Sequence, residues 1–255
     1  MNTKITLLNF DGTLQKQKRL KVYPGEWIDF SDLRGCQGYC EMATLKIIRQ
    51  RLQSRKHKGI TLIGNGNYHY VTYLLLSEIK QPFSLLLFDH HTDLSLNDDL
   101  SVISCGSWVS FALKTLPMLQ HAVIIGANTS SDDFDERKIP QNVTVISENE
   151  VKQSPVATME KKILSVLRDQ PIYISVDKDV LDEENAATNW DQGSMSLLQL
   201  LYLIRDLKHT NPILGVDICG ELPLSPVDFL SPELVRHVKK NEIANKAIVD
   251  ILSAS

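Results

Sequence analysis

Cysteine is scarce in this sequence and long apolar runs are absent, and each shortage excludes a class of protein. Only 4 of the 255 residues are cysteine, too few for the disulfide framework of a chain this size, so we expect reduced thiols. No stretch approaches the roughly 18 consecutive apolar residues of a membrane-spanning helix. The apolar run in the opening MNTKITLLNF is too short for a signal peptide. We therefore expect a cytoplasmic protein with no membrane segment.

An excess of positive charge is also missing. The 27 Lys and Arg residues against 31 Asp and Glu residues give a net charge of −4, and the basic residues are scattered, which argues against a nucleic-acid or membrane-surface partner. What the chain does have is apolar residues, at 43%, enough to bury one large core. No repeat or linker divides the sequence, so we expect a single domain over residues 1–255.

Short apolar segments alternate along the chain with segments of helical spacing. The expected strands are Ile5–Phe10, Ile60–Gly64, Ser84–Asp89, Ala122–Ala127, Val143–Ile146, Ile172–Asp177 and Ile213–Ile218. The expected helices are Met42–Leu52, Val71–Ile79, Met159–Leu167, Leu197–Leu207 and Pro232–Leu252. Strands that are continuously apolar indicate a mainly parallel sheet covered on both faces. The sequence therefore predicts an α/β protein with a three-layer α/β/α fold, in which sites form at the carboxyl ends of strands.

Two of these strands end in acidic clusters. One runs into Asp89-His90-His91-Thr92-Asp93, where alternation places Asp89, His91 and Asp93 on one face. The other ends in Asp177-Lys178-Asp179, with both acids on one side. Buried carboxylates need a cation, and oxygen-rich sites with imidazoles suit Mn²⁺ and similar divalent ions. The alternative, acids that cap helices or are solvated in loops, fits a lone aspartate better than two clusters.

Two other strand ends resemble known signatures without matching them. Asn9-Phe10-Asp11-Gly12-Thr13 is similar to the motif of aspartate phosphatases, but Asn9 occupies the nucleophile position and an amide cannot form the phosphoenzyme. We interpret it as a turn and keep the phosphatase as a weak rival. Gly64-Asn65-Gly66 lacks the third glycine of a dinucleotide-binding loop, because His69 stands there. His69 then becomes a further candidate ligand at a strand end.

Three motifs together resemble the ureohydrolases, the family of arginase, agmatinase and formiminoglutamase. They are Gly66-Asn67-Tyr68-His69, Asp89-His90-His91-Thr92-Asp93 and Ser175-Val176-Asp177-Lys178-Asp179-Val180-Leu181-Asp182, and the resemblance extends from about Ile60 to Pro223. It implies two manganese ions, one held by His69, Asp89, Asp93 and Asp177, the other by His91, Asp89, Asp177 and Asp179. Asp89 and Asp177 would bridge the pair.

The resemblance also implies a reaction. Two divalent ions roughly 3.5–4 Å apart lower the pKa of a shared water and supply a hydroxide near pH 7. In the family this hydroxide attacks the carbon of a guanidinium or formimino group, and Asp93 would hold it by a hydrogen bond. We therefore expect hydrolysis of a C–N bond in a guanidino, amidine or formimino small molecule. Relatives commonly form trimers or hexamers, so a homo-oligomer is expected from the resemblance alone.

The sequence departs from the family at two positions that would touch the substrate. Where relatives carry Ser-His-Gly with a proton-transferring His, this chain has Ser104-Cys105-Gly106, and Cys105 is either a proton donor or a packing residue. Where relatives carry a substrate-binding Glu, this chain has Gly220, with Glu221 one step later. One step along a strand reverses the side chain, so Glu221 would need a loop or bulge to reach the site. Asp93, Cys105 and Glu221 are the candidate catalytic residues.

Asn189-Trp190-Asp191 lies in the loop after the second acidic cluster and is the candidate substrate-binding segment. Alternatively, Trp190 packs as a lid over the core. Lys178, between two expected ligands, should face the opposite side and form a structural salt bridge. Two rival functions stay open: a catalytically idle relative that keeps its metals, and a deacetylase-like amidohydrolase with one zinc ion.

Overall fold

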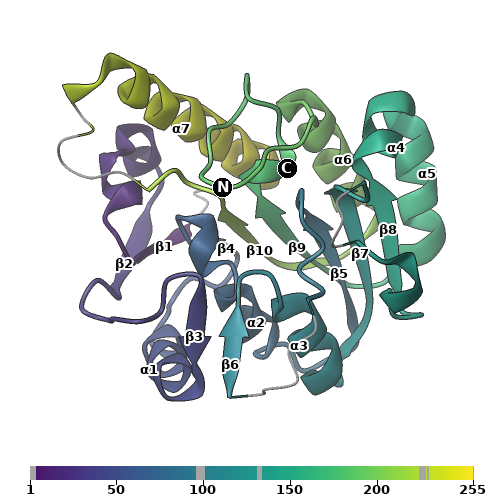
Figure 1. The fold of residues 1–255 in the computed structure, drawn as a ribbon, viewed down its shortest axis with the longest axis horizontal. Helices are drawn as coiled ribbons and strands as arrows, with labels where there is room; N and C mark the ends of the chain where they lie inside the picture. Colours follow the sequence, from purple (N-terminus) through teal and green to yellow (C-terminus); the bar gives the residue numbers. More distant parts are fainter. Residues whose placement is uncertain (1–3, 96–100, 131–133, 224–227, 229, 255) are drawn as a thin grey trace.

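The computed structural model describes residues 4–95, 101–130, 134–223, 228 and 230–254 (Figure 1). Their strands, in chain order, are β1 (Ile5–Asn9), β2 (Gly25–Asp29), β3 (Tyr39–Glu41), β4 (Ile60–Leu62), β5 (Phe83–Phe88), β6 (Val102–Ser104), β7 (Leu119–Ala127), β8 (Val143–Ser147), β9 (Ile172–Asp177) and β10 (Ile213–Cys219). Eight of them form one sheet in the order β2-β1-β4-β10-β9-β5-β7-β8, with each neighbouring pair parallel. The other two, β3 and β6, form a small antiparallel sheet.

Helices cover both faces of the large sheet. They are α1 (Met42–Gln53), α2 (Val71–Leu76), α3 (Trp108–Thr115), α4 (Glu148–Gln153), α5 (Val156–Leu167), α6 (Leu197–Thr210) and α7 (Pro232–Ser253). Figure 1 shows α1 to α3 on one side of the sheet and α4 to α7 on the other. The predicted three-layer α/β/α fold is confirmed. Within the described ranges, no helix combines the length and the apolarity needed to cross a membrane.

The continuous apolar strands arise because the sheet has an apolar layer on each face. All six residues of β5 are buried, and they divide by alternation. Leu86 and Phe88 join the cluster that contains apolar residues of α4 to α7, whereas Leu85 and Leu87 join the cluster of α1 to α3. A strand with neighbours above and below has no polar face, which is why its sequence reads as one run.

The elements that the sequence pattern did not predict are short or exposed. β2 lies at the edge of the sheet, and its five residues alternate between exposed and half-buried, so it lacks the apolar run used to recognise buried strands. α4 has only six residues, although the capping box of Ser147 and Glu150 marks its start. The expected strand at Ile5–Phe10 ends at Asn9, where the side chain of Asn9 accepts a hydrogen bond from the Gly12 N–H at 3.0 Å. This contact supports the turn interpretation of that segment.

The strand order brings distant motifs to one edge. β4, β10, β9 and β5 are consecutive in the sheet and all run the same way. Their carboxyl ends therefore lie side by side, and each of the expected ligand motifs follows one of them. The pairing of Cys219 on β10 with Asp177 on β9 fixes the register at this edge.

Candidate metal centre

The expected metal ligands meet at the carboxyl edge of the sheet. His69 follows a single 3-10 turn, η3 (Gly66–Tyr68), after β4. Asp89 begins the segment after β5, and Asp177 is the last residue of β9. Their side chains are almost fully buried. The three motifs that resemble those of the ureohydrolases thus converge on one place.

Asp89 stands between two groups of ligand atoms. On one side, the His69 Nδ1 atom lies 3.3 Å from Asp89 Oδ2 and 3.3 Å from Asp93 Oδ2. On the other, the His91 Nδ1 atom lies 3.5 Å from Asp89 Oδ1 and 3.0 Å from Asp179 Oδ2. In each group the three donor atoms lie within 4.8 Å of one another. Asp89 offers one oxygen to each group, which is the arrangement of a carboxylate that bridges two ions.

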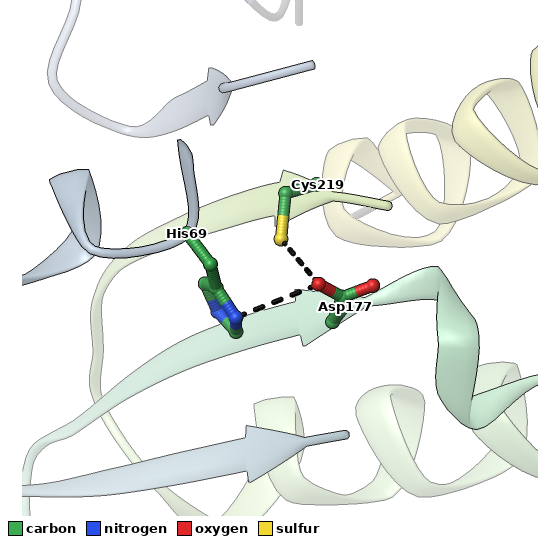
Figure 2. Close-up of side chains that lie close together, drawn as sticks. All are labelled: His69, Asp177 and Cys219. Atoms are coloured by element: carbon green, nitrogen blue, oxygen red, sulfur yellow. Dashed lines mark hydrogen bonds and ion pairs between the residues drawn. The ribbon is translucent and has the colours of Figure 1, made fainter. Parts of the chain in front are cut away.

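Asp177 lies on the His69 side of the cluster. Its Oδ2 atom is 3.5 Å from His69 Nδ1 and 3.1 Å from the Sγ atom of Cys219 (Figure 2). These three side chains form a third group with donor atoms within 4.8 Å. None of the three groups places Asp177 with His91, so its expected role as a second bridging ligand stays a prediction.

The charges of this cluster fit a cation site. Burial, together with neighbouring carboxylates, raises the pKa values of Asp89, Asp93, Asp177 and Asp179. Burial opposes the charge of His91, but its hydrogen bonds to Asp179 and Asp89 outweigh that effect and raise its pKa to about 12. Without a bound ion, the carboxylates and His91 therefore tend to keep their protons, and these protons take the place of the cations that the cluster could hold. Carboxylate oxygens with two imidazoles suit hard or intermediate divalent ions such as Mn²⁺.

Neighbouring polar groups orient the ligands. The His69 Nε2 atom lies 2.9 Å from the hydroxyl of Ser175, and that hydroxyl donates to Asp217 Oδ1 at 2.7 Å. Because the Ser175 proton goes to Asp217, the hydroxyl oxygen accepts from His69 Nε2–H, which leaves the Nδ1 lone pair free for an ion. Asp93 is held by the indole N–H of Trp108, which donates to Asp93 Oδ2 at 2.5 Å.

A cavity of about 790 Å³ opens over the cluster. Besides ligand residues, its lining includes Cys105, Phe134, Asp135, Lys138, Trp190 and Asp191. His91 is the most open of the ligands, with 37% of its side chain exposed, so substrate would approach from its side. A volume of this size suits a small molecule rather than a polymer.

Cys105 lies where the sequence predicts a catalytic group. It lines the cavity and is half-buried. Burial and the charge of Asp93 raise the pKa of its thiol to about 12, so the sulfur carries its proton at neutral pH. A protonated thiol can donate a hydrogen bond or a proton, but it is not a nucleophile.

The Asn189-Trp190-Asp191 segment reaches the cavity with two of its three residues. Trp190 and Asp191 line the cavity, and Asn189 is absent from the lining. The Trp190 indole N–H donates to Asn67 Oδ1 at 3.1 Å, and its ring meets that of His91 edge-on, with centroids 5.9 Å apart. With 42% of its surface exposed, Trp190 forms a wall of the cavity and not a lid buried over the core.

Glu221 requires a correction, because the structure does not bring it to the cavity. Its side chain is 2% exposed and forms an ion pair with the fully buried Lys178, with Nζ and Oε1 2.7 Å apart. Asn241 and Asn245 of α7 donate to the same carboxylate at 3.1 and 2.6 Å. Glu221 is thus fully engaged by structural partners, and Lys178 forms the structural salt bridge expected of it.

The reason lies in the residue before Glu221. Gly220 has a φ of +82°, in the left-handed region that favours glycine. A Cβ atom there would overlap Asp177 Oδ1 and the backbone nitrogen of Lys178. The chain therefore turns after Cys219 and takes Glu221 away from the ligands, toward Lys178.

Comparison with known proteins agrees with this centre. The family model described as "Arginase family" matches residues 6–226, most of the chain.

The chain belongs to the arginase family.

Members of this family are hydrolases with a metal centre. An uncharacterized protein of Thermotoga maritima is 34% identical to this arginase-family chain over 225 residues, which cover 88% of the chain and 82% of that protein. An agmatinase of Blochmanniella floridana is 27% identical, with 82% of this chain and 66% of the agmatinase covered. Among solved structures, an arginase from Bacillus subtilis superposes with a TM-score of 0.71 at 16% identity, covering 100% of this chain and 99% of the other. That likeness shows a shared fold.

Sequence reasoning missed several residues around the centre. They are Cys219, Trp108, Ser175, Asp217, Asp135 and Lys138, which contact ligands or line the cavity. Two of them carried a usable signal, because Cys219 directly follows an expected strand and Ser175 precedes Asp177 by two residues on the same face. The others come from segments whose approach to the site only the folded chain shows.

Proposed function

We propose that this arginase-family protein hydrolyses a C–N bond in a guanidino, amidine or formimino small molecule, with two divalent ions, Mn²⁺ or other divalent metals, as cofactors. The observation that carries the proposal is the position of Asp89, whose two oxygens face His69 and His91 separately. A single ion would occupy only one of the two ligand groups that share Asp89, and the other group would have no ion.

The ligand side chains divide into those that hold each ion and one that both share. His69, Asp93 and Asp177 would hold one ion, His91 and Asp179 the other, and Asp89 both. Two such ions, when bound, activate a water molecule for attack on a carbon centre. Asp93 lines the cavity and accepts a hydrogen bond from the Trp108 indole, and its carboxylate would hold the attacking water by a hydrogen bond.

The cavity wall would bind the rest of the substrate. Trp190 offers a flat aromatic surface beside His91, and Asp191 adds a carboxylate for a cationic or hydrogen-bonding group. Lys138 and Asp135, whose charged groups lie 3.9 Å apart, also line the cavity and offer charges of both signs. Cys105 supplies a protonated thiol near Asp93 that can donate a proton to a leaving amine.

Metal content and product release together test this proposal. Protein purified without chelators is assayed for ions per chain, and then for release of urea or ammonia from guanidino, formimino and amide compounds with manganese added. Two ions per chain with turnover of one compound is the expected result. Asp206→Asn, at a surface position of α6 where the carboxylate pairs with Arg205, serves as a control for the loss of a carboxylate in Asp89→Asn.

Each other result has a defined meaning. Two ions without turnover of any compound would favour the catalytically idle relative. One zinc ion with turnover of an amide would favour the deacetylase-like enzyme. No bound ion after addition of manganese would refute the proposal. Gel filtration of the same sample tests the homo-oligomer expected from the family.

A further inference from the structure

Cys219 is the last residue of β10 and lies beside the ligands at the edge of the sheet. Its register partner is Asp177 on the neighbouring parallel strand, so the two side chains leave the sheet on the same side. Figure 2 shows the Cys219 thiol and the His69 imidazole directed at the same oxygen of Asp177. Cys219 Sγ, Asp177 Oδ2 and His69 Nδ1 belong to a three-residue group with donors within 4.8 Å.

The position of Cys219 is fixed from two sides. Its carbonyl oxygen accepts a hydrogen bond from the buried Lys178 Nζ at 2.8 Å. The next residue, Gly220, adopts a positive φ that turns the chain immediately after it. The side chain is completely buried, so its sulfur has no water to contact and meets the ligand cluster instead.

The other buried cysteines differ in what their sulfur atoms meet. Cys36 and Cys40 pack in the apolar layer of α1 to α3, and the Cys40 thiol donates weakly to the carbonyl of Glu41 at 3.5 Å. Their environment is that of small apolar residues. Cys219 alone among these three belongs to a group that includes an imidazole and a carboxylate.

We propose that the Cys219 thiolate is a ligand of the ion on the His69 side, and that this position therefore prefers a thiophilic ion such as Zn²⁺, Co²⁺ or Fe²⁺ to Mn²⁺. The inference rests on the proposed function in that it requires an ion beside His69. Bonds of about 2.3 Å to sulfur and 2.1 Å to nitrogen place two donors on one ion at most about 4.4 Å apart. The donor atoms of this group lie within 4.8 Å of one another, close to that limit.

The two ion positions then differ in chemistry. Asp89, His91 and Asp179 present oxygen and nitrogen atoms, which suit manganese, whereas the His69 side adds a soft sulfur atom. The thiol proton leaves when the ion binds, because the thiolate is the form that coordinates metal. The centre would hold two different ions.

Cobalt spectroscopy tests the sulfur bond directly. Metal-free full-length protein is titrated with Co²⁺ without oxygen, and an intense sulfur-to-cobalt charge-transfer band in the near ultraviolet is expected at the first equivalent. Cys219→Ser and Cys219→Ala should lose the band, while Cys36→Ala and Cys105→Ser keep it. A wild-type protein that binds cobalt without the band, or a band that survives both Cys219 variants, would overturn the proposal.

Metal competition separates ligation from simple support of Asp177. Cys219→Ser should lower the ratio of zinc to manganese affinity at the His69 side by about tenfold or more. Equal losses for both metals would mean that Cys219 only positions Asp177, and the proposal would be wrong. Two bound ions with turnover but no charge-transfer band would remove this inference and leave the proposed function intact.

Discussion

The buried ion pair between Lys178 and Glu221 allows a test of what stabilises the carboxyl edge of the sheet, where the candidate ligands lie. In Glu221→Gln the carboxylate becomes an amide. Each side chain that contacts this carboxylate, the Lys178 ammonium and the amides of Asn241 and Asn245, is a donor. The ammonium would lose its counter-charge, and the new NH₂ group would face donors, with the unpaired Oδ1 of Asn245 as an acceptor only if that amide flips.

The structure sets the size of the effect. Removing one partner of a buried pair costs about 3–5 kcal/mol, because the other charge stays out of water without compensation. With a urea slope of roughly 3 kcal/mol/M for a chain of this size, the unfolding midpoint should fall by about 1–1.7 M. Lys178→Met should show a similar loss. In the double variant Lys178→Met/Glu221→Leu, the two asparagine amides keep their bonds to Ala187 and Gln17, so it should be more stable than either single variant.

Urea unfolding of metal-free and metal-loaded protein, followed by circular dichroism, measures these values. Lys152→Met is the control, because its i,i+4 pair with Glu148 is half exposed on the lysine side, and such pairs are worth about 0.5 kcal/mol or less. The inference that this ion pair stabilises the carboxyl edge would be wrong if Glu221→Gln lowered the free energy of unfolding no more than this control does. It would also be wrong if the losses of free energy in the two single variants simply added in the double variant.

Further predictions concern the centre itself. Asp89→Ala should lose both ions together in metal analysis, and retention of one ion would show that Asp89 does not bridge. Trp108→Phe should weaken metal binding by about 10–100-fold, because Asp93 loses its orienting donor; unchanged affinity would contradict that role. Since the ligand pKa values are raised, the metal-free centre holds protons that ions must displace, so affinity should rise with pH, and calorimetry in different buffers should detect proton release. Cys105→His should raise guanidino hydrolysis by about tenfold or more if proton transfer is limiting, whereas an unchanged rate in the ammonia assay would assign Cys105 to packing.

The fold could be predicted because the strands that build it are buried on both faces. β5 and β9 appear in the sequence as apolar runs, each interrupted by one serine, and then change abruptly to acids at the carboxyl edge. The ligand motifs could also be predicted, because each is a short segment in which the alternation of side chains along a strand fixes which residues lie on the same face. His69 could be included because two glycines place it just beyond a strand.

The remaining features of the site depend on contacts between segments that are far apart in the sequence. The direction of Glu221 is set by the turn at Gly220 and by two asparagines of α7, 20 and 24 residues farther along the chain. Trp108 reaches Asp93 across 15 residues of sequence. Cys219 lies beside the candidate ligands because of its register with Asp177 on another strand. None of these contacts has a periodic pattern that one sequence could reveal.

The turn at Gly220 also restricts which substitutions this position can accept, in engineering or in evolution. A carboxylate grafted at this position by a single substitution would force the Asp177 side chain and the Lys178 backbone to move, and with them the centre that the graft was meant to serve. The substrate-binding Glu that the resemblance implies at this position would therefore need a remodelled strand end and not a single substitution. Change of substrate is easier at Trp190 and Asp191, which line the cavity and are not among the proposed ligands.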